Sequence, residues 1–364
     1  MTLFLFFMVL AVLVLVHEAG HFLAAKLFRI RVDEFGLGFP PRLFSVQRGE
    51  TRYSLNLIPF GGFVKIFGEN PMEEIKDGEE NRNFSQKPRG VQAFVLVAGI
   101  LGNLMLAWGL LSAGFMAGLP APADGAWELP VTDAALTVVE VLPNSPAEQA
   151  GFRVGDKIHS LAEGAREIFS PSPEATSAFI AETKSGAITF AVERGGEELL
   201  VSVAPIHGVV EGRYAIGVAM DMLGVVRLPP MRAVLEGAKT TIFLSVETAR
   251  ALGQLVRDAF TGDADFKNLA GPVGIAGLVG EARAQGVAPL LSLTALISIN
   301  LALINLVPFP ALDGGRLLFV AIETVRRKAL PPKIAQTANA VGFLLLLLFI
   351  AFITYHDLAR LFSS

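Results

Sequence analysis

The residues best suited to chemistry are His17, Glu18 and His21, which lie in the pentapeptide H-E-A-G-H. In a helix, a spacing of four residues places the two imidazoles on one face, one turn apart. Two such imidazoles can bind one zinc ion, and the glutamate between them can take a proton from a water molecule. The pattern therefore predicts a zinc-dependent hydrolase with Glu18 as its catalytic base.

The motif lies in an apolar segment long enough to cross a membrane. Residues 1–16 carry no charge, and the apolar run continues to about residue 25. Ionisable groups inside hydrocarbon are costly and usually mark functional sites, so the pattern points to hydrolysis within the membrane. A cleavable signal peptide is the alternative, but the segment lacks a positively charged start and runs directly into the motif.

Composition indicates a polytopic membrane protein. The 364 residues are 52% hydrophobic, with a mean hydropathy of +0.53. Besides the first segment, three uncharged stretches reach the length of about 20 residues that a spanning helix needs: 90–123, 286–312 and 334–355. We therefore expect an α-helical fold with four transmembrane helices. The absence of cysteine excludes disulfides and thiolate ligands, and a net charge of −4 implies no nucleic-acid partner.

The distribution of basic residues predicts the orientation. Eleven Lys or Arg residues lie in 26–89, against eight in the longer stretch 119–232, and five more lie in 316–333. Because cytoplasmic loops are enriched in Lys and Arg, the loops after spans one and three are expected in the cytoplasm. Both termini and the loop between spans two and three are then expected outside. The candidate metal site falls toward the cytoplasmic side.

Residues 35–67 predict a β-hairpin within the first loop. The segment is glycine-rich and β-prone, and residues 52–58 alternate polar and apolar as a half-exposed strand does. It is either a cytoplasmic hairpin or a membrane-associated, re-entrant one that dips toward the metal site and offers an edge to substrate. The second reading makes Leu55 and Leu57 substrate-binding positions. The polar segment 70–89 is expected to be an exposed loop.

Residues 130–220 predict a small α+β domain inserted between the two parts of the membrane core, 1–119 and 286–364. Strands at 136–141 and 188–192 flank a helix near 173–183, and Ser145 to Gly151 has the residues of a short capped helix. Between the domain and the second core part, 230–285 holds an amphipathic helix at 234–260. That helix either lies on the outer membrane surface or packs on the inserted domain.

A carboxylate is needed as the third zinc ligand, because catalytic zinc usually has three protein ligands and no other histidine is suitably placed. Two of the remaining histidines fall in the inserted domain and one at the outer end of span four. Asp313, at the end of span three, is expected at the same depth as His17 and His21. Pro308 and Pro310 break the helix before it. Asn300 and Asn305 could hold an unwound substrate backbone or stabilise an oxyanion.

These motifs together resemble the site-2 proteases, specifically the bacterial regulator-of-sigma-E protease group with a single PDZ domain. The matching stretches are H-E-A-G-H, 59–66, Asn103, a bacterial-type PDZ-like pattern at 139–158, 271–275 and 305–315. The resemblance implies Zn²⁺ at His17, His21 and Asp313, Glu18 as base, and substrate positioning by Asn300 and Asn305. It adds Asn103 to the candidate substrate-binding positions. Ile100 stands where relatives often have a proline before this asparagine.

We therefore expect an intramembrane zinc metalloendopeptidase of the bacterial cytoplasmic membrane. Its partners would be the lipid bilayer and single-pass membrane proteins already trimmed outside, such as anti-sigma factors or remnant signal peptides. The alternatives are a proteolytically inactive PDZ-bearing scaffold and a metal carrier. An intact Glu18 argues against the scaffold. The carrier would need polar groups along a pore, whereas the polar groups here cluster at one depth.

Overall fold

The computed structural model describes residues 2–69, 79–123, 129–184, 186–210, 212–262 and 270–363. The chain forms two compact units. The first comprises 1–112, 234–280 and 292–359, and the second comprises 113–233 with 281–291 and 360–364. The predicted polar loop at 70–89 falls partly on 70–78, outside the described residues.

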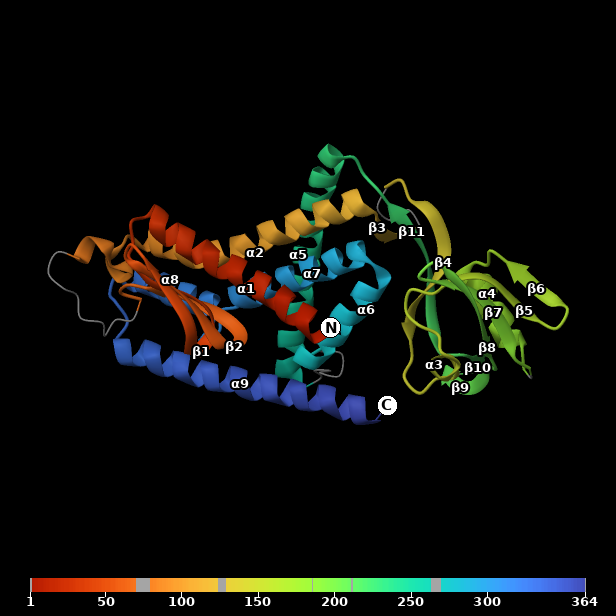
Figure 1. Ribbon diagram of the computed structural model, residues 1–364. Helices are drawn as coiled ribbons and strands as arrows, with labels where there is room; N and C mark the ends of the chain where they lie inside the picture. Colours follow the sequence, from red (N-terminus) through yellow and green to blue (C-terminus); the bar gives the residue numbers. More distant parts are fainter. Residues whose placement is uncertain are drawn as a thin grey trace. The chain divides into compact units, whose positions relative to one another are not determined.

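Four helices in the described part of the chain are long and apolar enough to cross a membrane, as the hydropathy pattern predicts. They are α1 (Thr2–Leu27), α2 (Arg89–Ala117), α7 (Val287–Leu306) and α9 (Pro332–Ser363), drawn as long coils in Figure 1. In α9 the span itself covers Pro332–Ala359. The chain is therefore a polytopic membrane protein with a separate β-sheet region.

The amphipathic segment forms α5 (Pro230–Thr261), which packs on two of the spans. Trp108 Nε1 of α2 donates to the Val234 carbonyl at 2.8 Å, and Leu244 packs on a buried cluster from α2 and α7. A Cβ at Gly237 would lie 2.3 Å from Ser112 Oγ, so the helices meet there without a side chain between them. Much of the apolar face of α5, by contrast, is exposed. Its exposed side chains include Leu235, Ile242, Val246 and Val256.

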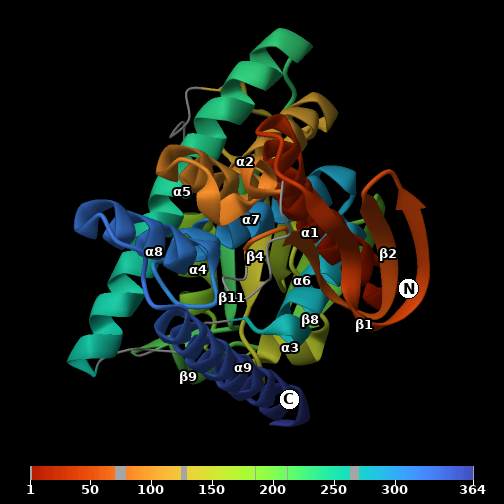
Figure 2. The same cartoon turned by 90° about the vertical axis from the view of Figure 1, so that its left-hand side faces the viewer.

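The predicted hairpin forms as β1 (Val32–Arg48) and β2 (Thr51–Ile66), and both figures of the whole chain show it beside α1 (Figures 1 and 2). Its register is unusual because both strands fold back on themselves. Leu37 pairs with Leu55 and also with Gly62, and Leu55 pairs on its other side with Phe44. The strand around Leu55 is therefore interior, and the second half of β2 lies at an edge.

The first half of β2 has its polar side chains inside and its apolar side chains outside. Ser54 and Asn56 are buried, with Ser54 Oγ donating to Glu34 at 2.6 Å and Asn56 Nδ2 donating to the Gly38 carbonyl at 3.0 Å. Leu55 and Leu57 are 47% and 54% exposed. A strand with this inverted polarity is suited to apolar surroundings.

Two 3-10 turns, η1 (Glu80–Arg82) and η2 (Phe84–Gln86), lead from the hairpin region to α2. Glu50, in the hairpin turn, forms ion pairs with two cations. Lys26 Nζ donates to Glu50 Oε1 at 2.7 Å, and Arg82 contacts the same carboxylate. Hydrogen bonds from these two cations hold the pKa of Glu50 below its ordinary value, and the bond from Lys26 has the larger effect.

The second unit is built on an antiparallel sheet whose strands do not follow chain order. The strand order is β3-β11-β4-β5-β7-β8, and β6 pairs with β5. In chain order the elements are β3 (Leu119–Pro122), β4 (Thr132–Val141), α3 (Pro146–Ala150), β5 (Lys157–Glu163), β6 (Arg166–Phe169), α4 (Pro173–Glu182), β7 (Ile188–Arg194), β8 (Glu197–Val203), β9 (Ile206–Val210), β10 (Arg213–Ala215) and β11 (Val218–Val226).

The predicted turn chemistry positions these elements. Ser145 caps α3 by accepting from the Glu148 amide, and Gly151 ends the helix at φ 89°. Asp156 is fully buried and accepts from the Arg153 amide and the Arg194 guanidinium. The strands and helices expected within 130–220 are thus present.

Candidate active site

Helix α1 presents His17 and His21 on one face, and both side chains are buried. The ring nitrogen Nδ1 of His21 lies 2.8 Å from the Val95 carbonyl oxygen. Donation from Nδ1–H to that carbonyl leaves Nε2 of His21 as the unprotonated nitrogen, which is the form a metal needs. The contact with α2 therefore fixes both the orientation and the tautomer of this imidazole.

Close approach between α1 and α2 depends on two glycines. A Cβ at Gly20 would lie 2.2 Å from the Ala98 carbonyl oxygen, and one at Gly99 would lie 2.3 Å from His21 Nε2. Any side chain at Gly99 would thus displace the imidazole. Ile100, which stands where relatives often have a proline, is buried, and helix α2 continues through it without a break.

Asp313 is the first residue of α8 (Asp313–Arg326), not the last residue of span three. Helix α7 ends at Leu306, and residues 307–312 form a loop that contains Pro308 and Pro310. Gly314 and Gly315 pack directly on the carbonyls of that loop and of the end of α7, where a Cβ would come within 2.3 Å of an oxygen. These glycines bring the start of α8 back against the end of α7.

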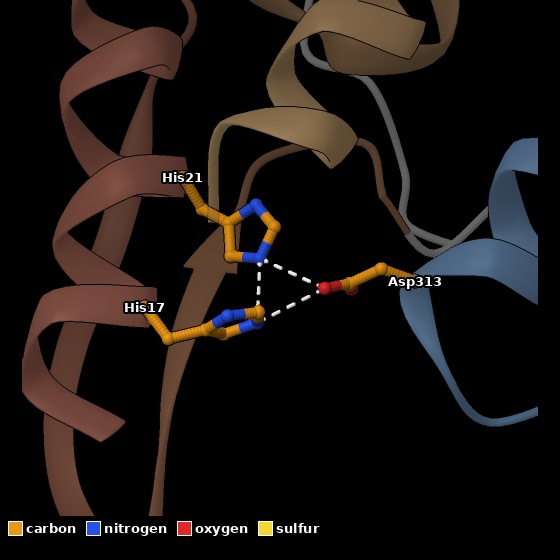
Figure 3. A group of neighbouring side chains, drawn as sticks. All are labelled: His17, His21 and Asp313. Carbon is orange, nitrogen blue, oxygen red and sulfur yellow. Dashed lines mark hydrogen bonds and ion pairs between the residues drawn. The ribbon is translucent and has the colours of Figure 1, made fainter. Parts of the chain in front are cut away.

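The two imidazoles and the carboxylate converge on one point, as Figure 3 shows. Asp313 Oδ2 lies 3.0 Å from His17 Nε2 and 3.1 Å from His21 Nε2, and the two nitrogens are 3.2 Å apart. Ligand atoms about 2.0–2.1 Å from a tetrahedral zinc ion are separated by about 3.3 Å. The donor set and its spacing therefore fit three corners of a zinc site with the fourth left open.

Asn103 of α2 completes the surroundings of His17. Its Nδ2 lies 3.3 Å from His17 Nδ1, its side chain is fully buried, and its Oδ1 has no hydrogen-bond partner. If His17 binds metal through Nε2, its Nδ1 carries a proton and needs an acceptor. Rotating the carboxamide by 180° would place Oδ1 beside that N–H, which satisfies the orphaned oxygen. The geometry suits Asn103 to orienting His17 rather than to contacting substrate.

A cavity of about 220 Å³ opens beside the triad. Glu18 lines it together with His17, Asp313, Asn305 and the glycines of the hairpin, Gly61 and Gly62. A Cβ at Gly62 would lie 2.8 Å from Val14 Cγ1 and 3.3 Å from Glu18 Cγ. The edge of the hairpin thus runs next to the candidate base with no side chain between them.

Two of the residues predicted to bind substrate are not among those that line this cavity, and their role in substrate binding stays a prediction. Leu55 and Leu57 are outside its lining, and the strand around Leu55 is paired on both sides. The edge of the hairpin near the triad is instead at Gly61 and Gly62. The Gly-Gly doublet in the sequence was the available signal, since it permits backbone approach.

Asn300, whose role in positioning substrate stays a prediction, contacts α5. Its Oδ1 accepts from Thr248 Oγ1 of α5 at 3.3 Å, and it does not line the cavity, whereas Asn305 does. Five residues correspond to about 140° around a helix, so these two asparagines face different directions. Other lining residues that the sequence did not single out are Val14, Leu301, Ala311 and Leu312.

Comparison with known proteins identifies the family. The model of peptidase family M50 matches residues 5–349. The chain belongs to peptidase family M50, the site-2 protease family. It is 34% identical to a putative zinc metalloprotease of Clostridium perfringens over 95% of each chain. It is 30% identical to the zinc metalloprotease RasP of Oceanobacillus iheyensis over 98% of each. A putative zinc metalloprotease of Nostoc is 35% identical over 93% of this chain and 91% of its own.

The M50 chain is therefore a zinc metalloprotease with Zn²⁺ as its cofactor. The family and the four apolar helices also make it a membrane protein. An enzyme of this kind is neither of the non-enzymatic alternatives, scaffold or carrier. The match extends from α1 into α9, so it includes every residue of the triad.

Proposed function

We propose that this protease cleaves peptide bonds within transmembrane segments, with His17, His21 and Asp313 as zinc ligands and Glu18 as base. The observation that carries the proposal is the triad itself. Three buried or half-buried donors meet at one point, and they come from an apolar span and from the start of a helix next to another span. Ionisable groups are retained in such surroundings chiefly for function.

When bound at such a site, zinc supplies a Lewis acid and lowers the pKa of water. The chain's own residues supply the rest. Glu18, in the same cavity, takes the proton from the attacking water and returns it to the leaving amine. His21 is held by Val95, and Asn103 holds His17, so neither imidazole needs to reorganise during the reaction. Asn305 lines the cavity and can donate to the scissile carbonyl.

A helical substrate must unwind before its backbone can reach this cavity, because a helix satisfies its carbonyls internally. The edge of β2 at 61–66 offers an alternative pairing partner, since β1 covers only its other side. An unwound substrate strand can add to that edge by backbone hydrogen bonds, with Gly62 allowing it to pass close to Glu18. The apolar outer face of the hairpin supports its association with the membrane.

We expect Gly62→Val to lower cleavage by about 10- to 100-fold without removing zinc, since displacing a bound substrate by about 1 Å has effects of that size. The valine would collide with Val14 and intrude on Glu18, and the atoms nearest to its Cβ belong to Val14, Gly36 and Glu18 rather than to the three ligands. Turnover of a vesicle-embedded single-span peptide and the metal content are measured together. Leu43→Ala, at an exposed position on the same hairpin and outside the cavity lining, is the matched control. Wild-type turnover in Gly62→Val would place the substrate elsewhere.

The second unit supports a PDZ-like assignment for residues 130–220. A groove of about 230 Å³ lies between α4 and β11, lined among others by Ile180 and by Tyr214 to Met220. PDZ domains bind peptides by adding a strand beside a helix of this kind.

We propose that the single-pass substrates are already trimmed outside, as anti-sigma factors or remnant signal peptides would be.

The excess of basic residues in 26–89 and 316–333 supports an orientation with these loops in the cytoplasm and both termini outside. This orientation puts the zinc site toward the cytoplasmic half of the bacterial inner membrane. The inserted domain at 130–220 would then lie outside.

The proposed function predicts that cleavage of a vesicle-embedded peptide follows zinc. A chelator should abolish turnover of the reconstituted full chain, and stoichiometric zinc should restore it, because the site is otherwise complete. A chelation-resistant activity on the same peptide would reject the zinc-dependent mechanism.

A further inference from the structure

The position of Asp313 depends on the loop that precedes it. Ala311, two residues before Asp313, has φ 76°, a left-handed conformation that residues other than glycine rarely adopt. Ala311 and Leu312 line the same cavity as Asp313. Leu312 caps α8 without a side-chain hydrogen bond, and its amide donates to the Phe309 carbonyl at 3.1 Å across a turn with Pro310 and Ala311 at its centre. That turn needs a positive φ at Ala311, which is unfavourable for alanine, so a contact from outside the loop adds to its stability.

Helix α9 holds the loop from behind. The Ala311 amide N–H donates to Asn339 Oδ1 at 3.2 Å. One turn further along α9, Gly342 meets the loop directly, because a Cβ there would lie 2.5 Å from the Pro310 carbonyl oxygen. Among the described residues, the Asn339 side chain is thus the hydrogen-bond acceptor that α9 offers to the Ala311 amide.

Only 6% of the apolar window of α9 is buried, so few of its side chains are enclosed by the rest of the described protein. A carboxamide in such a helix is costly unless its polar atoms are bonded. A second polar side chain, Asp357, accepts from the Gly271 and Gly274 amides at 3.2 and 2.9 Å. Asp357 follows Asn339 by eighteen residues, which is five turns, so both lie on the same face. That face docks α9 at the loop and again at the start of α6 (Pro272–Gln285).

We infer that Asn339 is a positioning residue for the protease reaction. It touches neither substrate nor metal, and it acts through the Ala311 amide to keep Asp313 Oδ2 within reach of both imidazoles. Without the acceptor, the amide is left unsatisfied and Ala311 is released from its left-handed conformation. The carboxylate then loses its fixed position beside His17 and His21. The inference rests on the proposed assignment of Asp313 as a zinc ligand.

The test measures zinc affinity of the full chain in detergent by competition with a chelator. Asn339→Leu should weaken zinc binding by about 10-fold, in the range typical of residues that support metal ligands. Asn339→Asp keeps an acceptor and should bind nearly as the parent does. Ala311→Gly added to Asn339→Leu should restore most of the affinity, because glycine adopts positive φ freely. Thr337→Leu, an exposed polar position on the same helix, is the control and should change nothing.

The possible results separate this inference from the zinc site itself. Parental affinity in Asp313→Ala would reject the site, and the inference with it. Loss of zinc in Asp313→Ala but not in Asn339→Leu would overturn the positioning role alone. A loss in Asn339→Leu that Ala311→Gly does not restore would also overturn it, since packing would then be the cause. If Asn339→Leu fails to accumulate in the membrane, Asn339→Ser replaces it under the same criteria.

Discussion

Glu18→Gln is expected to abolish peptide-bond cleavage while leaving zinc bound. Glutamine is nearly isosteric with glutamate but cannot take a proton from water, and general-base catalysis contributes about 10²- to 10⁴-fold. Glu18 lines the cavity, but it is not one of the three converging donors, so the metal should remain. The measurement pairs turnover of a vesicle-embedded single-span peptide with metal analysis of the same preparation.

Glu198→Gln is the control for this variant, because it makes the same exchange on an exposed strand of the second unit. It should leave both turnover and zinc content unchanged. Turnover close to the parental rate in Glu18→Gln would remove Glu18 from the mechanism. Loss of zinc in that variant would instead assign Glu18 to the metal site.

Asp313→Ala is expected to have the largest effect on the metal. The change removes one of three donors, and with it the carboxylate that contacts both His17 and His21. Loss of a residue that supports a metal ligand lowers metal affinity by about 10- to 100-fold. We expect loss of a ligand to lower zinc affinity by more than this, and cleavage to fall with it. Chelator competition measures the affinity. Asp258→Ala, on α5, is the control. Full zinc occupancy with intact activity in Asp313→Ala would show that another residue is the third ligand.

The helical part of the site was predictable because its signals are local. The spacing of His17 and His21 fixes their common face, and the length of each apolar stretch predicts the spans. Pro308 and Pro310 indicated a break before Asp313. They did not show that the chain restarts as α8, because that depends on how Gly314 and Gly315 pack on the preceding carbonyls.

The hairpin shows what a local pattern leaves out. Alternation predicted a strand at 52–58, and β2 begins at Thr51. Which half of β2 is at the edge depends on β1 inserting between its two halves, a pairing that alternation does not encode. Alternation also does not say which face is buried. In apolar surroundings the polar face turns inward, so Leu55 and Leu57 are exposed.

The three asparagines differ for similar reasons. The angle between Asn300 and Asn305 follows from their spacing, so the sequence could have shown that both do not face one cavity. The contact of Asn103 with His17 could not be foreseen, because it depends on how α1 and α2 pack at Gly20 and Gly99. The role of each asparagine in catalysis stays a prediction.

The most direct test of the central proposal locates the bond that is cut. The purified chain is reconstituted in vesicles with a single-span peptide whose apolar segment is flanked by soluble tags, and the product masses are determined. We predict a cut within the apolar segment that disappears on chelation and in Glu18→Gln. Cuts confined to the soluble flanks, or cuts that persist in Glu18→Gln, would contradict intramembrane proteolysis at this site.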